Sequence, residues 1–158
     1  MRIALSIVFV FFASVGFAKT CVDDRVFLEW EKGGASFKVD IVDTPESRAQ
    51  GLMFVESMPR FSGMLFVYEK PQRQIAFWMR NTLISLDILF FDETGVLKTI
   101  QKNAVPLDDT TLPGGSGIQY VLEINGGLSD TLRIPEGAVL VSNRIAPELA
   151  AMPCFAAE

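Results

Sequence analysis

The stretch that decides the fold is LDILFFD at residues 86–92, followed by ETG at 93–95 and VLKTIQ at 96–101. Both apolar stretches are typical of β-strands. Glu93, Thr94 and Gly95 interrupt the apolar run as the residues of a turn do. The sequence therefore predicts two successive strands around residue 94.

Outward from this pair, strand patterns recur along the chain. They lie at residues 26–30, 35–42, 63–68, 75–79, 118–125 and 137–143. Gly33 and Gly34 suggest a hairpin turn between the first two, and Pro113–Gly117 is expected to be a mobile loop. About eight short strands predict a mainly β fold, either a compact antiparallel barrel or a jelly-roll-like sandwich.

One short helix is predicted at residues 45–51. Thr44 can cap its start, Pro45 suits its first turn, and Glu46 suits the positive end of the helix dipole, while Gly51 marks its end. A weaker helical pattern covers residues 128–132. The helices are thus minor additions to a β-rich domain.

The N-terminus predicts a cleavable secretory signal. Arg2 precedes an apolar run, residues 3–12, and Gly16-Phe17-Ala18 fits the small-x-small rule for cleavage before Lys19. The run is short for a membrane-spanning helix, which needs about 20 apolar residues, although an uncleaved anchor is the alternative. We therefore expect a signal peptide at 1–18, one domain at 19–158, and a periplasmic or secreted protein without membrane insertion after cleavage.

The charge of the chain limits its partners, and its cysteine content agrees with export. The chain has 14 basic and 19 acidic residues, which disfavours nucleic acid and anionic lipid as partners. Its two cysteines, Cys21 and Cys154, lie near the two ends of the exported chain. An oxidising compartment favours a disulfide between them, with a redox pair or a metal site as the alternative.

The absence of histidine from the sequence excludes several kinds of site. Ser/His/Asp and Cys/His nucleophiles, histidine metal sites and histidine pH switches all need this residue. No Walker loop or GxGxxG sequence supports nucleotide binding. We accordingly assign no catalytic residue, no metal site and no cofactor from sequence.

Four of the six methionines fall between residues 53 and 79, beside several phenylalanines and Trp78. Thioether side chains fill irregular apolar cores, and this is the simpler interpretation of Met53, Met58, Met64 and Met79. A Met-rich copper site is the alternative, since thioethers select Cu(I).

The same region holds the candidate ligand-binding residues: Arg48, Trp78, Asn81, Thr82 and Asp87. In one interpretation Arg48 and Asp87 form a buried ion pair while Asn81 and Thr82 stabilise a turn. In the other, Arg48 binds a carboxylate or a sugar hydroxyl in a cleft, Trp78 supplies a flat face, and Asp87 orients Arg48.

Two further carboxylates, Asp108 and Asp109, precede the glycine-rich segment. A solvated loop is the simple interpretation, and the spacing of an EF-hand calcium loop is missing. Paired with Asp87, either residue could serve a carboxylate-dependent hydrolase acting on carbohydrate. A purely interacting protein, with an exposed apolar patch and no pocket, is a third possibility.

Several of these motifs resemble the family called domain of unknown function 192. They are RAQGLM (48–53), SGMLF (62–66), FWMRNT (77–82), LDILFFD (86–92) and QYVLEINGG (119–127). The resemblance implies a compact β-sandwich-like domain with a short helix after the second strand, in small exported or soluble prokaryotic proteins. Arg80 and Ile84-Ser85 depart from the Lys and Ile-Pro usual in the family. The resemblance implies no activity. The candidate residues are therefore signature positions of the family and have no known catalytic role: Arg48, Trp78, Asn81, Thr82 and Asp87.

Taken together, these features of the sequence predict an exported, non-enzymatic protein with a binding or accessory role. The partner would be a small molecule or a protein of the cell envelope.

Overall fold

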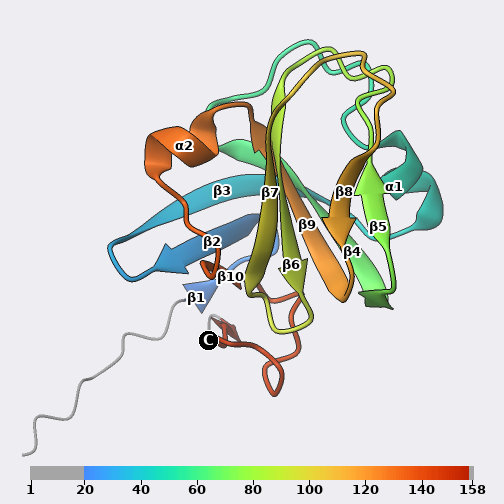
Figure 1. The fold of residues 1–158 in the computed structure, drawn as a ribbon. Coiled ribbons are helices and arrows are strands. Elements are labelled where there is room, and N and C mark those ends of the chain that lie inside the picture. The colour runs from blue at the N-terminus through green and yellow to red at the C-terminus, as the bar shows by residue number, and fades with distance from the viewer. Residues whose placement is uncertain (1–19, 157–158) are drawn as a thin grey trace, which may run out of the picture.

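The computed structural model describes residues 20–156 and is mainly β (Figure 1). The predicted signal peptide, 1–18, lies outside the described residues. The strands are β1 Thr20–Cys21, β2 Arg25–Trp30, β3 Gly33–Val42, β4 Ser62–Gln72, β5 Ile75–Phe77, β6 Leu86–Asp92, β7 Leu97–Ala104, β8 Leu112–Gly115, β9 Ile118–Asn125, β10 Val139–Val141 and β11 Phe155–Ala156. The helices are α1 Pro45–Gln50 and α2 Leu128–Leu132. Both predicted helices are confirmed; α1 ends at Gln50 because Gly51 forms its C-cap.

One curled sheet dominates the domain, with the strand order β10-β2-β3-β4-β9-β6-β7. Its two edge strands approach each other, because Val96 pairs with Val139 and the Leu97 N–H donates to the Ala138 carbonyl at 2.8 Å. The predicted compact, barrel-like β fold is therefore confirmed. One detail differs: β3 and β4 are parallel. The segment between them, which includes α1, returns the chain so that β4 runs in the same direction as β3.

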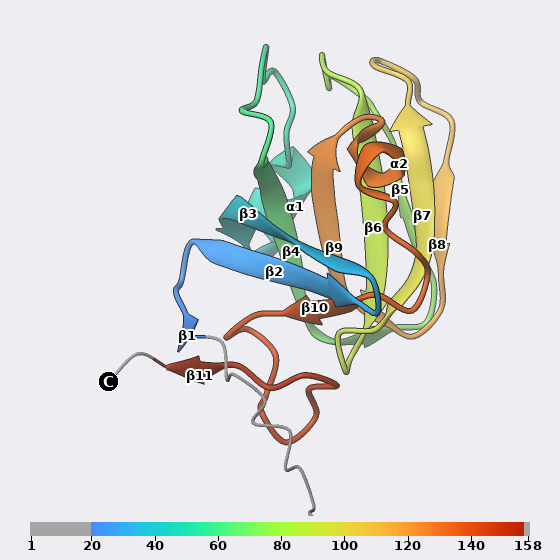
Figure 2. The same cartoon turned by 90° about the vertical axis from the view of Figure 1, so that its left-hand side faces the viewer.

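The central strands are buried on both faces, which explains the continuous apolar run of residues 88–91. Leu89 and Phe91 lie in a core enclosed by the curled sheet. Ile88 and Phe90 belong to a second core on the opposite face, together with residues of β5 and of the segment after α1. The small sheet of β5 and β8 stands beside this second face (Figure 2). The side chains of a strand alternate between faces, so both sets of large residues are needed.

Two glycine-rich segments differ from expectation. Gly33 and Gly34 pair with Trp30 and Glu29 inside the β2–β3 ladder, so the turn is made by residues 31–32. Residues 112–115, expected to belong to a loop, form β8. A Cβ on Gly114 would lie 2.2 Å from the Phe90 ring, so glycine is required there by close packing.

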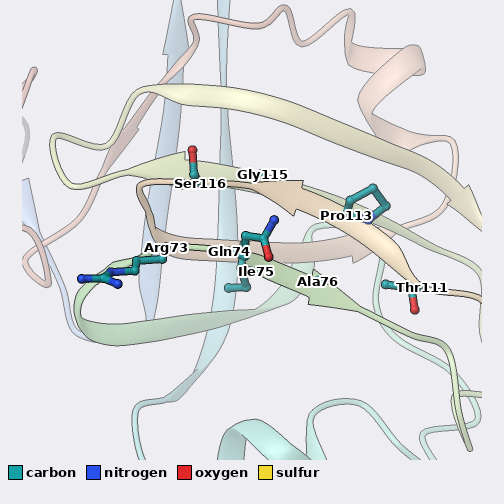
Figure 3. A pocket seen from close by; sticks show the side chains of 8 residues that line it. All are labelled: Arg73, Gln74, Ile75, Ala76, Thr111, Pro113, Gly115 and Ser116. Atoms are coloured by element: carbon teal, nitrogen blue, oxygen red, sulfur yellow. The ribbon is translucent and has the colours of Figure 1, made fainter.

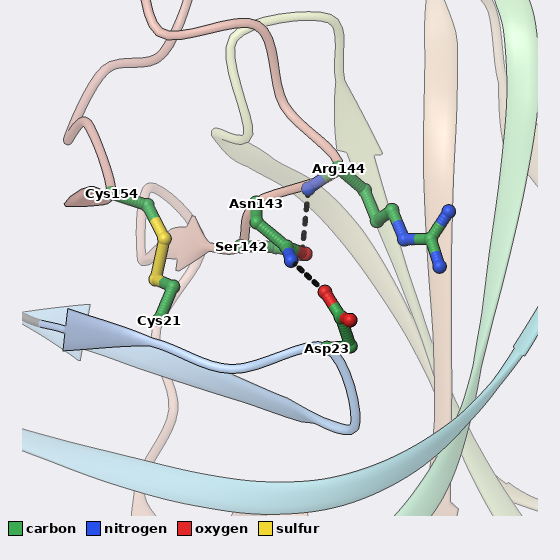
Figure 4. The surroundings of a disulfide bond; sticks show 6 residues. All are labelled: Cys21, Asp23, Ser142, Asn143, Arg144 and Cys154. Carbon is green, nitrogen blue, oxygen red and sulfur yellow. Dashed lines mark hydrogen bonds between the residues drawn. A yellow bond between two sulfur atoms is a disulfide. The ribbon is translucent and has the colours of Figure 1, made fainter. Parts of the chain in front are cut away.

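The two ends of the described chain are joined by the predicted disulfide. Cys21 and Cys154 are bonded, and β1 pairs in parallel with β11 beside them. Figure 4 shows a second link nearby, in which the Asn143 amide donates to the Asp23 carboxylate at 2.5 Å. Within residues 20–156 no helix is long and apolar enough to cross a bilayer.

Candidate functional site

A cleft of about 410 Å³ lies between α1 and the strand β5. Its lining comes from four separate parts of the chain and contains three aromatic side chains. The lining residues are Arg48, Ala49, Tyr68, Ala76, Phe77, Trp78 and Thr111. Two of the residues predicted from sequence, Arg48 and Trp78, therefore meet at one cleft.

The capped helix α1 positions Arg48. The Ser47 N–H donates to the Thr44 hydroxyl at 3.1 Å, and the Thr44 N–H donates to the Ser47 hydroxyl at 3.1 Å, which forms a reciprocal capping box. This fixes the first turn of a helix that has only six residues. Arg48 lies in the last turn, and its guanidinium reaches the Val67 carbonyl of β4.

The guanidinium of Arg48 is held without an acidic partner. Its Nη1 donates to the backbone carbonyls of Asp43 at 2.6 Å and Val67 at 2.9 Å. Its Cζ lies 4.6 Å from the centroid of the Tyr68 ring. Among residues 20–156 it forms no salt bridge. Arg48 is thus an oriented positive charge that a bound anion could neutralise.

Trp78 supplies the flat face expected from sequence. Its side chain is 49% exposed, and the Arg80 Cζ lies 4.3 Å from the centroid of its ring. Arg80 in turn pairs with Asp109 at 2.9 Å. The charge of Arg80 is therefore already compensated, unlike that of Arg48.

A smaller cavity of about 40 Å³, which we call the inner cavity, adjoins the cleft. The two share Arg48, Ala49, Phe77 and Trp78. Glu123 of β9 lines it and is only 4% exposed. Among the described residues no group forms a hydrogen bond with its Oε2. Burial raises the pKa of the Glu123 carboxyl to about 8. The lining of this cavity thus includes a carboxyl group that keeps its proton at neutral pH.

Sequence reasoning missed Glu123, although a signal for it exists. In β9, Leu122 and Ile124 face the enclosed core while Val121 faces the opposite one. Period-two alternation places Glu123 on the same face as Val121, where its paired neighbours are Met64 and Ile88. An acidic residue at an apolar position of a strand buried on both faces is a candidate for function.

Thr82 joins this site and Asn81 does not. Thr82 is buried, lines the inner cavity, and directs its hydroxyl toward the Arg80 carbonyl at 3.5 Å. Asn81 instead shapes the neighbouring loop. Its backbone is left-handed, with a φ of 57°, and its carbonyl accepts a hydrogen bond from the Phe54 N–H at 2.8 Å.

Asp87 lies apart from the cleft, and the ion pair with Arg48 considered from sequence is not formed. Its carboxylate is fully buried and accepts three backbone N–H groups: Asn103 at 2.8 Å, Gly127 at 3.0 Å and Ser129 at 2.8 Å. These bonds tie the end of β7 to the start of α2. The position of Asp87 in the family motif is therefore explained by folding.

The carboxylates proposed as partners of Asp87 for hydrolysis also have other contacts. Asp108 accepts the Thr110 N–H at 2.8 Å, and hydrogen bonds from the Thr110 side chain and backbone lower the pKa of Asp108. Asp109 pairs with Arg80. Neither residue lines the cleft, so the structure offers no support for a carboxylate pair with Asp87.

The methionines pack mainly into the second core. Met64 and Met79 are buried there, and Met58 packs against it. Met53 accepts a weak hydrogen bond from the Asn81 amide at 3.8 Å. In residues 20–156 no three His, Cys, Asp or Glu side chains are grouped as metal ligands. These positions fit the core-filling interpretation of the methionines.

A second hollow, of about 520 Å³, runs along β5 and β8 and shares Ala76 and Thr111 with the cleft. Figure 3 shows its lining residues on these two strands and in the segments next to them, with Arg73 at the end far from Thr111. The remaining residues of the lining are Gln74, Ile75, Pro113, Gly115 and Ser116. It contains no buried acid, so the Arg48 cleft holds the more distinctive chemistry.

Three loops beside the cleft expose large apolar side chains. Backbone bonds join these loops: the Phe54 N–H donates to the Asn81 carbonyl, and the Leu107 N–H donates to the Thr82 carbonyl. Phe54 and Leu107 are 67% and 62% exposed, and both have left-handed backbones. These side chains are exposed beside a cleft, so the combination of an apolar patch with no pocket, considered from sequence for an interacting protein, is not what the described residues show.

The fold and the cleft define a class: a small β-rich domain with a curled sheet and an aromatic side cleft containing one oriented arginine. The family model of domain of unknown function 192, described as an uncharacterized ACR, matches residues 28–142. The chain belongs to this family, as the sequence motifs predicted.

Two solved structures are similar. One is a protein of unknown function from Novosphingobium aromaticivorans, 38% identical, with a TM-score of 0.71 over 73% of this chain and 82% of that one. The other, from Sinorhizobium meliloti, is described as a candidate transcription regulator; it is 34% identical, with a TM-score of 0.72 over 77% and 94% of the two chains. No curated protein matches the chain.

Proposed function

We propose that this protein is an exported, non-enzymatic domain that binds a small molecule carrying a carboxylate or hydroxyl groups. One observation carries the proposal: Arg48 faces the aromatic cleft, is fixed by two backbone carbonyls and a ring, and has no acidic partner among the described residues. A guanidinium oriented in this way forms strong charge-assisted hydrogen bonds with an anion. The flat face of Trp78 suits a planar ligand or a sugar ring.

Other roles have less support. The Sinorhizobium relative is described as a candidate transcription regulator. This chain has a net charge of −5, and its described helices contain six and five residues, whereas DNA-reading motifs place a longer helix in the major groove. A hydrolase of that kind would need a pair of carboxylates at the substrate, and Asp87 lines neither the cleft nor the smaller cavity. Binding therefore explains the site better.

The first prediction concerns Arg48. Thermal-shift screening of carboxylates, sugars and peptides should identify a ligand. Replacing Arg48 by methionine, Arg48→Met, should lower the affinity for this ligand by about 10- to 100-fold, because charge-assisted hydrogen bonds contribute about 1.5–3 kcal/mol. Trp78→Ala should also lower the affinity for this ligand, because it removes the flat aromatic face. Isothermal titration calorimetry on each folded variant measures the affinity.

The matched control is Arg73→Met, which removes a guanidinium from the neighbouring hollow and leaves the cleft intact. It should bind with wild-type affinity. If Arg48→Met and Trp78→Ala bind every responding ligand as tightly as wild type does, the Arg48 cleft is not the binding site.

Export gives the second prediction. When the gene is expressed in a Gram-negative host, the protein should accumulate in the periplasm with Lys19 as its N-terminal residue, because residues 16–18 fit the cleavage rule. Intact-mass analysis of the periplasmic fraction measures the cleavage site. The disulfide between Cys21 and Cys154 supports this proposal, since such bonds persist in oxidising compartments. Uncleaved protein found only in the cytoplasm would contradict it.

A further inference from the structure

The inner cavity contains a group for which folding alone gives no reason. A buried carboxyl normally has hydrogen-bond partners, because an unsatisfied polar group costs free energy. The Oε2 of Glu123 has none among the described residues, and its paired neighbours in the sheet are Met64 and Ile88. A leucine at this position would avoid the cost. The carboxyl therefore points to a contact made with something outside the chain.

We propose that the protonated carboxyl of Glu123 is a second recognition group, which donates a hydrogen bond to the carboxylate of an aromatic monocarboxylate while Arg48 neutralises its charge. This inference rests on the proposed function and specifies the ligand class. The inner cavity, about 40 Å³, has room for one small polar group. The outer cleft, about 410 Å³ with Tyr68, Phe77 and Trp78 in its lining, has room for an aromatic ring.

The groups that face Glu123 favour a ligand with hydrogen-bond acceptors. Arg48 from α1 and Thr82 from the segment before β6 line the same inner cavity, and both carry N–H or O–H donors. Arg80 lines it as well, but Asp109 compensates its charge. Tyr68 of β4 is near enough for the Glu123 charge to raise its pKa, although burial raises it more and Arg48 lowers it. A protonated Glu123 adds one more donor to this set.

The protonation of Glu123 should control binding. Burial keeps the carboxyl neutral at pH 7, since its pKa is raised to about 8. Above that pH the cavity gains a negative charge, which repels a carboxylate and removes the donor. The affinity for an aromatic carboxylate should then fall by roughly tenfold per pH unit.

Benzoate is the probe, and benzyl alcohol is its uncharged counterpart. Calorimetric titration from pH 6 to pH 10 should show wild-type affinity for benzoate constant to about pH 8 and falling above it. Glu123→Gln is the matched variant, because its amide is always neutral and always a donor; it should bind benzoate at neutral pH with nearly the same affinity and lose the alkaline fall. Glu123→Leu should bind benzoate at least tenfold more weakly. Benzyl alcohol should show a much smaller alkaline fall, because it has no charge to be repelled and its hydroxyl can donate to the ionised carboxylate.

The outcomes separate the two proposals. Benzoate binding that depends on Arg48 but has the same pH profile in wild type and Glu123→Gln overturns the role of Glu123 and leaves the proposed function standing. Binding of other screened ligands, with no response to benzoate, overturns the ligand class alone. If no screened compound binds, or if Arg48→Met binds every responding compound as tightly as wild type does, the proposed function itself fails.

Urea unfolding gives a readout that needs no ligand. A glutamate whose pKa is raised on folding stabilises the protein fully below its unfolded pKa, here 4.5, and this stability is lost as pH rises toward about 8. The unfolding midpoint of wild type should therefore fall across this range more steeply than that of Glu123→Gln. Equal slopes would show that Glu123 does not hold the proton, which overturns the inference.

Discussion

Replacing both cysteines by serine, Cys21→Ser with Cys154→Ser, should lower the free energy of unfolding by up to about 4–5 kcal/mol. The bond joins residues 133 positions apart, so it restricts nearly the whole unfolded chain. In the chain-entropy model the stabilisation grows with the length of the closed loop, and a loop of about 100 residues gives about 4.7 kcal/mol. Urea unfolding of the oxidised protein and of the double variant measures the difference.

The control for this change is the wild-type protein treated with dithiothreitol. It lacks the bond but keeps both side chains, so it should unfold at the same urea concentration as the double variant. Coincident curves for oxidised wild type, reduced wild type and the double variant would show that the bond contributes no stability.

Replacing Asp87 by alanine should destabilise the protein by more than about 3 kcal/mol. The change leaves the N–H groups of Asn103, Gly127 and Ser129 without their acceptor in a buried site. Each buried unsatisfied group costs about 1–3 kcal/mol. Asp87→Asn should also destabilise, because Oδ2 accepts the Ser129 N–H and an amide nitrogen at that position cannot accept.

The matched control for Asp87 is Asp92→Asn at the β6–β7 turn. Asp92 accepts the N–H groups of Thr94 and Val96 through Oδ1 alone, and asparagine retains this oxygen. Its effect should be well below that of Asp87→Asn in urea unfolding. If Asp87→Ala and Asp92→Asn have equally small effects, the three hydrogen bonds to Asp87 do not anchor α2.

Local patterns predicted the local structure well. The capping residues Thr44 and Pro45 identified α1, and alternating apolar residues identified most strands. Gly114 was misread because a glycine required by close packing against Phe90 looks, in sequence, like a glycine of a loop. The parallel pairing of β3 with β4 depends on the path of the connecting segment, which the composition of either strand does not determine.

The candidate site could be predicted only in part. Arg48, Trp78 and Thr82 were selected because polar and aromatic residues stood together in sequence, and the structure brings all three to the adjoining hollows. Asp87 was selected by the same reasoning, but its partners lie 16 to 42 positions away and are backbone groups that no side-chain pattern reveals. Glu123 comes from a distant strand, so its proximity to Arg48 required the tertiary fold.

The meeting of the two edge strands has a consequence for behaviour in a crowded compartment. An unpaired strand edge is a template on which other chains can build intermolecular sheets. Here the backbone of residues 95–97 is bonded to that of residues 137–140, and the Gln101 amide donates to the Pro113 carbonyl at 2.9 Å. These bonds close part of each edge of the main sheet to an incoming strand, so the folded chain offers a shorter template for polymerisation.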